Sequence, residues 1–216
     1  MNSYEWGVDS AGSVTEDIFQ CVIRNLGYPR FWGRYLARIP GISEGLTSQE
    51  VFFIHSKGIK ILPIYNAFQE AKGYLQGIHI AEDAVSYAQT LGIPIGTPLF
   101  ANLERHFDID KEWIIGWTEA IIRSGYESGI YNDPTKGNFN RAFCNAVNEN
   151  EKVKQLTILW SAEPDLAPSG LWDAPSFLPA APNCGGNVLI WQYSRDTSLC
   201  PVDTNLAEDW LVDVLW

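Results

Sequence analysis

Two polar residues in the middle of the chain have the spacing of one strand face. Asn102 and Glu104 follow the apolar run 98–101, and residues two apart on a strand point to the same side, about 6.6 Å apart. A glutamate held among aromatic rings can act as a general acid. A solvated glutamate, or one paired with Arg34 or the adjacent Arg105, is only a structural carboxylate. The spacing alone leaves both interpretations open.

Polar or aromatic residues also close the other apolar runs of the chain. They are Asp9, Arg34, Tyr35, Tyr65, Asn66, Tyr131, Trp160, Trp191, Gln192 and Tyr193. Solvent at strand ends explains the charged residues, but it does not explain why aromatic rings recur there. Pyranose rings stack on aromatic faces, and their hydroxyls bind carboxylates and amides. The pattern therefore predicts a sugar-binding groove.

Glycines indicate which elements position these residues. Helical patterns stop at Gly27, Gly58, Gly92 and Gly125, which are 31, 34 and 33 residues apart, and each stop precedes a strand-like run. A glycine just past a helix adopts the left-handed conformation that closes the last turn. The stretches 13–16 and 47–50 have the pattern of a capping box at a helix start. Repeating strand–helix units of this length predict a parallel sheet.

A closed barrel explains this repeat better than an open nucleotide-binding sheet. The turn after the first strand, 8–13, lacks a glycine-rich phosphate motif. Eight full units of about 33 residues would need about 264 residues, more than the 216 present. We expect an α/β fold, an irregular TIM-like (β/α) barrel with shortened C-terminal units that occupies 1–216 as one domain. The sheet should close between the Val8 and Trp191 strands, with a final helix from Leu206.

Composition narrows the range of partners. The chain has 15 Lys and Arg against 26 Asp and Glu, for a net charge of −11. Such a surface repels phosphate backbones and anionic lipid, so we expect no nucleic-acid or membrane partner, and a monomer. No export signal is evident at the start, which suggests a cytoplasmic protein or a mature exported form. The three histidines are isolated from one another, so we expect no metal site and no cofactor.

The four cysteines have no metal-ligand spacing. Cys21 and Cys144 fall in helical patterns, which favours buried free thiols. Cys184 and Cys200 flank an apolar strand in loop sequence. In an oxidising compartment these two can form a disulfide.

Several motifs together resemble a known group of enzymes. Val8-Asp9-Ser10, the Asn102-x-Glu104 pair, Trp191-Gln192-Tyr193-Ser194 and Val202-Asp203-Thr204-Asn205 are similar to motifs of the Chalaropsis-type lysozymes, glycoside hydrolase family 25. Over nearly the whole chain the sequence resembles the glycoside-hydrolase-like domain of unknown function 1906. That likeness rests on three segments of this chain, 6–10, 64–66 and 129–131.

The resemblance implies a lysozyme-like barrel that acts on or binds N-acetylated glycans of the peptidoglycan type. It assigns Glu104 as the acid and places Asp9 and Asp203 in the site. The lysozymes have an assisting aspartate where this chain has Asn102. An amide cannot act as a carboxylate nucleophile or stabilise positive charge as an anion does, although it can orient an acetamido group. A glycosidase, a carbohydrate-binding pseudoenzyme and a protein-interaction barrel therefore remain as alternatives.

Overall fold

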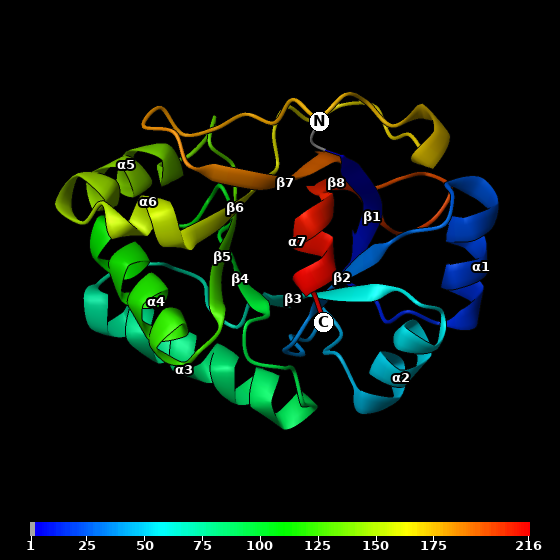
Figure 1. Ribbon diagram of the computed structural model, residues 1–216, viewed down its shortest axis with the longest axis horizontal. Helices are drawn as coiled ribbons and strands as arrows, with labels where there is room; N and C mark the ends of the chain where they lie inside the picture. Colours follow the sequence, from blue (N-terminus) through cyan, green and yellow to red (C-terminus); the bar gives the residue numbers. More distant parts are fainter. Residues whose placement is uncertain (1–2) are drawn as a thin grey trace.

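Eight strands close into a barrel in the computed structural model, which describes residues 3–216 (Figure 1). The neighbours in the barrel follow chain order. The first seven strands run parallel, and β8 runs antiparallel to both β7 and β1. The mixed α/β barrel predicted from the sequence is confirmed.

The strands and helices alternate regularly in the first part of the chain. The strands are β1 (Tyr4–Ser10), β2 (Phe31–Tyr35), β3 (Lys60–Tyr65), β4 (Pro98–Asn102), β5 (Glu127–Asn132), β6 (Thr157–Ser161), β7 (Asn187–Ser194) and β8 (Asp203–Glu208). The helices are α1 (Glu16–Asn25), α2 (Ser48–Ser56), α3 (Tyr74–Leu91), α4 (Lys111–Arg123), α5 (Phe139–Glu149), α6 (Lys152–Leu156) and α7 (Asp209–Val214), with a short 3-10 helix η1 (Leu171–Asp173).

The helix boundaries follow local chemistry. Gly27, Gly58, Gly92 and Gly125 all have positive φ angles, as the predicted helix stops require. Thr47 caps α2 by accepting a hydrogen bond from the backbone N–H of Glu50. At α1 the N-cap is Thr15 rather than Ser13, the first residue of the expected capping box.

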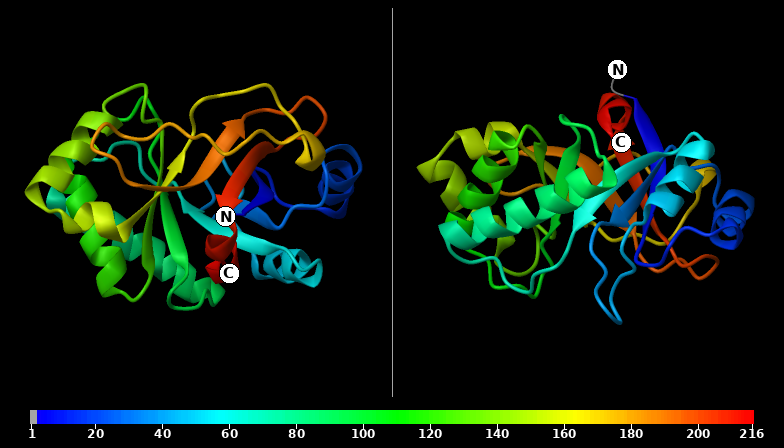
Figure 2. Two further views of the ribbon diagram at one scale, coloured as in Figure 1. Left: turned by 45° about the horizontal axis from the view of Figure 1, so that its top comes forward. Right: turned by 90° about the horizontal axis from the view of Figure 1, so that it is seen from below.

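The C-terminal third differs from the expected arrangement. The barrel does not close directly between β1 and β7, because β8 lies between them. Leu206 belongs to this strand, and the last helix begins only at Asp209. Between β6 and β7 the described chain holds no helix longer than η1. This connection crosses one side of the molecule as an extended segment, yellow to orange in Figure 2.

Two apolar layers hold the barrel together. One fills its interior, with Phe31, Leu62, Phe100, Trp160 and Ile190 among its members. The last helix, α7, closes one end of the barrel. Its residues Leu211 and Val212, and Leu215 just after it, belong to this inner layer. The other layer lies between the strands and the surrounding helices. Trp113 and Trp117 stack there with ring centroids 5.6 Å apart, as their helical spacing predicts.

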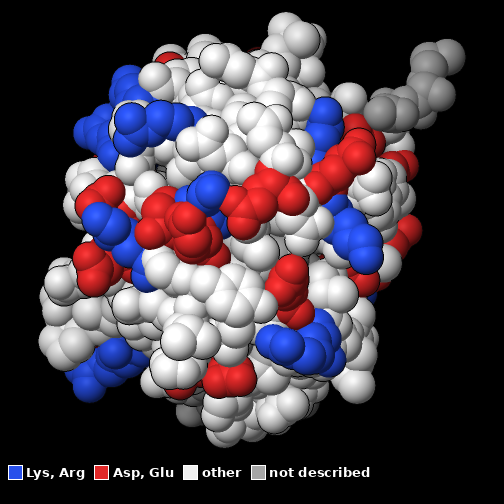
Figure 3. Space-filling view, turned by 90° about the vertical axis from the view of Figure 1, so that its left-hand side faces the viewer, with Lys and Arg blue, Asp and Glu red and all other residues white. Residues whose placement is uncertain are grey.

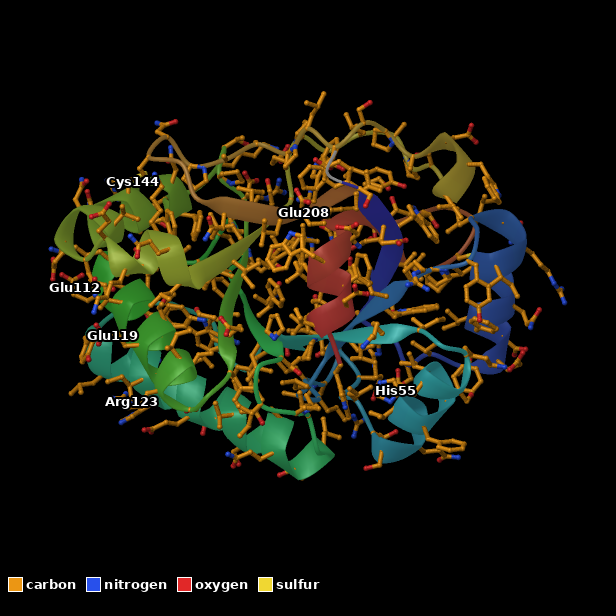
Figure 4. The ribbon with its side chains drawn as sticks, viewed as in Figure 1. His55, Glu112, Glu119, Arg123, Cys144 and Glu208 are labelled. Carbon is orange, nitrogen blue, oxygen red and sulfur yellow. A yellow bond between two sulfur atoms is a disulfide. The ribbon has the colours of Figure 1, made fainter. Side chains whose placement is uncertain are left out.

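Two disulfides attach long connections to helices. Cys21 of α1 pairs with Cys200 in the β7–β8 connection. Cys144 of α5, labelled in Figure 4, pairs with Cys184 in the β6–β7 connection. The expectation of free thiols at Cys21 and Cys144 is wrong, and the Cys184–Cys200 bridge that the sequence left open does not form. Each helical cysteine faces outward from its helix toward the connection that crosses it, a proximity that linear spacing does not reveal.

The outer surface carries charges of both signs. Figure 3 shows acidic and basic side chains interleaved over the face formed by α3 to α6. Glu112, Glu119 and Arg123 of α4 lie on this outer side, away from the barrel (Figure 4). No helix within residues 3–216 combines the length and the apolar character needed to cross a bilayer.

Candidate functional site at the barrel mouth

Strand alternation decides which side chains enter the barrel. On β2, Phe31 belongs to the inner layer and Trp32 to the outer layer. Gly33 therefore faces inward, where a Cβ atom would lie 2.6 Å from Cβ of Asp9. Only glycine leaves room there for the Asp9 side chain. Tyr35, two residues further on, packs on the inner layer. It lies at the end of the barrel where the parallel strands terminate, which we call the mouth.

Asp9, the penultimate residue of β1, lies inside the barrel and is 4% exposed. Its Oδ2 atom accepts hydrogen bonds from Nε2 of Gln192 at 3.0 Å and from Nδ2 of Asn205 at 2.8 Å. Gln192 Nε2 also lies 3.2 Å from Oδ2 of Asp203. The first, seventh and eighth strands thus bring Asp9, Gln192, Asp203 and Asn205 into one polar cluster.

Asn102 and Glu104 lie on the same side of the chain, as their spacing predicts. Nδ2 of Asn102 donates to Oε1 of Glu104 at 3.1 Å. Asn102 is buried and Glu104 is half-buried. Neither Arg34 nor Arg105 pairs with the Glu104 carboxylate, and its Oε2 atom accepts no hydrogen bond from the described residues.

Three of the predicted rings lie inside the barrel. Tyr131 and Trp160 meet edge to face, with centroids 5.0 Å apart, and Tyr35 packs on the same apolar layer. Trp160 donates its indole N–H to Oδ1 of Asn205 at 3.0 Å. The Tyr131 hydroxyl donates to Oε1 of Gln192 at 2.8 Å. Rings and polar cluster therefore form one connected floor beneath the mouth.

The other three predicted rings face outward. Tyr65 contacts Phe68 and Tyr87 beside α3. Trp191 donates to the carbonyl of Pro164, and Tyr193 donates to that of Ser169. These rings pack between the barrel and the segments around it and do not line the mouth.

Arg34 also lies outside the mouth. It follows inward-facing Gly33 on β2, so its side chain points toward α2 and is fully buried. Its Nε atom lies 2.6 Å from Oε1 of Glu50, and Nη1 donates to the carbonyl of Ser10. Arg34 thus fixes the backbone next to Asp9 and has no access to a ligand.

An open cleft of about 780 Å³ leads from the mouth. Asn66 lines it, as predicted, with Tyr35, Asn102 and Glu104. Its outer walls, which sequence analysis missed, come from the loops after β2, β3 and β4: Ile39, Ile42, Ala67, Phe68, Gln69, His106 and Phe107. A smaller pocket of about 160 Å³ lies on the other side of Glu104, beside Tyr131, Asp133 and Arg195. Glu104 therefore stands between two hollows.

Arg195 and Asn205 were also missed. Arg195 follows the Trp191–Ser194 motif directly, and its Nε atom donates to Oε1 of Gln192 at 3.2 Å. Asn205 stands two residues after Asp203, the spacing that puts both side chains on one face of a strand. Because a helix was expected from Leu206, the residues before it were not interpreted as a strand.

Burial and mutual repulsion determine the charge of the cluster. Burial, followed by the charge of Asp9, raises the pKa of Asp203 to about 8. Burial also raises the pKa of Asp9, although the amides of Asn205 and Gln192 oppose the shift. The hydroxyl pKa of Tyr35 rises through burial and through the nearby charges of Asp9, Glu104 and Asp203. These groups therefore share one electrostatic environment.

The side chains at the mouth are carboxylates, amides and aromatic rings. Within residues 3–216, no group of three or more His, Cys, Asp or Glu side chains is placed to hold a metal. Within residues 3–216, Oε2 of Glu104, which lines the cleft, and Oδ1 of Asp9, in the floor beneath it, accept no hydrogen bond. Amides and aromatic rings lie beside them. Such groups can bind a sugar and transfer a proton to it.

Comparisons with known proteins identify the family and the fold. A family model described as "Rv2525c-like, glycoside hydrolase-like domain" matches residues 22–206. The crystal structure of an uncharacterized B. stearothermophilus protein is 51% identical, with a TM-score of 0.96 over 98% of this chain and 100% of that one. No curated protein matches the sequence.

Two lysozymes share the fold at low identity. That of Streptomyces coelicolor is 12% identical, with a TM-score of 0.60 over 99% of this chain and 97% of that one. The family GH25 lysozyme of Aspergillus fumigatus is 10% identical, with a TM-score of 0.58 over 99% of each chain. Because the family model covers 22–206 of the 216 residues, the chain belongs to the Rv2525c-like, glycoside hydrolase-like domain family.

Proposed function

We propose that the barrel mouth binds N-acetylated glycans of the cell-wall type and that Glu104 is the general acid of a slow hydrolysis. The observation that carries the proposal is a pair of open carboxylate oxygens. Oε2 of Glu104 and Oδ1 of Asp9 accept no hydrogen bond from the described residues. The other oxygen of each carboxylate does accept one or more. Both residues act electrostatically on Tyr35, which supports their facing one site.

The surroundings suit a sugar chain. The 780 Å³ cleft combines apolar walls with the amides of Asn66, Gln69 and Asn102. A 2-acetamido sugar carries an apolar methyl group, an N–H donor and a carbonyl acceptor, which can use such walls and amides together. The lysozymes that share this fold support a glycan as the ligand of such a barrel.

The proposed reaction begins with proton transfer from Glu104 to the glycosidic oxygen. The bond from that oxygen to the anomeric carbon breaks, and the leaving sugar departs with the new hydroxyl. The acetamido oxygen of the substrate attacks the anomeric carbon and forms a cyclic oxazolinium ion. Asn102 donates its N–H to Glu104, so its Oδ1 is free to accept the acetamido N–H and orient that group. Water, deprotonated by the Glu104 carboxylate, then opens the ring.

A binding protein without turnover is the second candidate. Asn102 favours it, because a neutral amide supplies no negative charge to the oxazolinium ion. The proposed sugar contacts are the same in both cases. The two candidates differ only in whether the remaining carboxylates supply enough field for reaction.

The test combines binding and turnover in one variant pair. Calorimetry with the N-acetylglucosamine tetramer should show binding by the wild-type protein, and chromatography should show slow cleavage. Glu104→Gln should abolish cleavage and change affinity by no more than a few-fold. Glu119→Gln is the matched control, since Glu119 accepts hydrogen bonds from Tyr74 and Asn150 on the outer face.

Each outcome separates the alternatives. Cleavage that persists in Glu104→Gln contradicts the role of Glu104. Binding without cleavage in the wild type supports the second candidate. If the N-acetylglucosamine tetramer does not bind at millimolar concentration, or binds no better than the cellulose tetramer, both candidate functions are contradicted.

A further inference from the structure

Asp9 and Asp203 face each other across two neighbouring strands. They are directly paired in the register of β1 and β8, and both side chains point into the barrel toward Gln192. Directly opposite residues in an antiparallel pair have Cα atoms about 4.5–5.5 Å apart. Like charges at such positions destabilise a sheet, and the interior offers little water to screen them. Two full negative charges are therefore unfavourable here.

A single amide bridges the two carboxyl groups. Nε2 of Gln192 on β7 lies 3.0 Å from Oδ2 of Asp9 and 3.2 Å from Oδ2 of Asp203. The two hydrogens of this one nitrogen can serve both carboxyl groups at once. Gln192 is 3% exposed, so the bridge is shielded from solvent.

The neighbours of the amide permit only one orientation. Oε1 of Gln192 receives Nε–H of Arg195 and the hydroxyl of Tyr131. The guanidinium has only donors, so the amide oxygen must face Arg195 and the amide nitrogen must face the carboxyl groups. Trp160, also a donor only, fixes Asn205 in the same way through Oδ1. Both amides are thus aimed at Asp9.

We propose that Gln192 is a positioning residue that holds Asp9 and Asp203 as one pair, a carboxyl group beside a carboxylate, which carries a single negative charge at neutral pH. Tyr131 and Arg195 lock the amide of Gln192 in the orientation that the pair requires. A proton removed from either carboxyl group is felt by the other, so the pair titrates as one unit.

The charged and titratable neighbours of the pair include more acidic groups than basic ones. Facing it are Tyr35 from β2, Glu104 after β4, Tyr131 from β5, and Arg195 and Asp196 from the β7–β8 connection. Arg195 is the one cation among them, and Asp165 shares its charge through an ion pair of 3.0 Å. Burial and repulsion raise the pKa of both members of the pair.

The inference deepens the proposed function and rests on it for its biological meaning. With Asn102 neutral, the pair is the source of negative charge below the bound sugar. One charge and one acidic proton under the mouth favour ligands that offer both a donor and an acceptor, as the 2-acetamido and hydroxyl groups of N-acetylated sugars do. The proton itself is measurable without any glycan.

The experiment is a carbon-13 NMR titration of protein labelled at the aspartate carboxyl carbons, from pH 5 to 10. Substitution of Asp9 and of Asp203 by Asn assigns the two signals. In the wild type, both signals should move in a common step near pH 8. Asp203→Asn should remove that step and lower the midpoint of Asp9, because a neighbouring negative charge is lost.

Two further variants test the role of Gln192. Gln192→Leu removes both donated hydrogen bonds and should move the alkaline midpoint upward by about one pH unit, since the ionised form loses its donors. Tyr131→Phe should move this midpoint upward by a smaller amount. It is the milder substitution and tests the same role if Gln192→Leu does not fold. Tyr126→Phe, which loses a buried hydrogen bond to the carbonyl of Ile93, should leave it unchanged.

Independent titration of Asp9 and Asp203 below pH 6 would overturn the pairing. An unchanged midpoint in both Gln192→Leu and Tyr131→Phe would overturn the positioning role. Neither outcome depends on glycan binding, so a failure here is distinguishable from a failure of the proposed function.

Discussion

The side-chain amide of Asn102 donates a hydrogen bond of 3.1 Å to the carboxylate of Glu104. This contact fixes the orientation of the proposed acid and leaves Oδ1 of Asn102 free for a ligand. It also marks the point where a second carboxylate would add negative charge beside the reacting centre. In the proposed reaction, the contact therefore links the position of Glu104 to the rate of hydrolysis.

A carboxylate at position 102 should increase turnover. Groups aimed at charge in a transition state are worth about 3–4 kcal/mol, or about 10²- to 10³-fold in rate. Asn102→Asp should therefore raise the hydrolysis of the N-acetylglucosamine tetramer, by up to that factor, in a chromatographic assay. An unchanged or lower rate in a folded variant would contradict this role. Asn25→Asp, on the outer end of α1, serves as the matched control.

Stability should decrease as pH rises toward 8. Folding raises the pKa of Asp203 from 3.8 to about 8, so the native state binds more protons than the unfolded state within that window. The free energy of unfolding then falls between pH 4 and 8 and levels off above. Groups with lowered pKa values, such as Asp108 and Asp133, act instead below about pH 4.

Denaturant titrations at several pH values check this dependence. Asp203→Asn should flatten the decline, because the amide cannot ionise. Asp213→Asn, at an exposed position of α7, should retain it. A wild-type stability that increases from pH 5 to 8 would contradict the predicted dependence.

The buried ion pair behind the mouth should be important for stability. Arg34 and Glu50 are 0% and 5% exposed and lie 2.6 Å apart. Glu50→Gln leaves the guanidinium buried with a weakened partner and should cost about 3–5 kcal/mol. Glu44→Gln disrupts the exposed Arg38–Glu44 pair and should cost at most about 1 kcal/mol. Equal losses in urea denaturation would contradict the difference.

All four cysteines should resist thiol reagents until they are reduced. Cys21–Cys200 and Cys144–Cys184 leave no free cysteine. Each closed loop restricts the unfolded chain, so loss of one bridge should cost about 2–4 kcal/mol. Peptide mapping without reduction should recover these two pairs. Recovery of a Cys184–Cys200 peptide would contradict the structure.

Sequence patterns predicted the repetitive part of the fold because its signals are local. Gly58 and Gly92 mark helix ends by their own backbone conformation, and the strands that follow are continuous apolar runs. By contrast, β8 contains Asp203, Thr204 and Asn205, whose polar character hides a strand that is buried only by its neighbours. Its place between β7 and β1 depends on barrel closure, which no local pattern contains.

The candidate site was predictable by residue type but not by side-chain direction. Arg34 and Tyr35 are adjacent, and only the register of β2 decides that Tyr35 enters the mouth and Arg34 does not. The same parity sends Gln192 inward and its neighbours Trp191 and Tyr193 outward. The partners of Cys21 and Cys144 likewise depend on how two long connections cross helices.

A crystal of the protein soaked with the N-acetylglucosamine tetramer tests the central claim most directly. The account predicts a sugar in the 780 Å³ cleft, with the open oxygens of Glu104 and Asp9 in hydrogen-bond contact and an acetamido group at Asn102. A tetramer bound elsewhere on the surface, or a cleft that stays free of sugar at millimolar ligand, would contradict it.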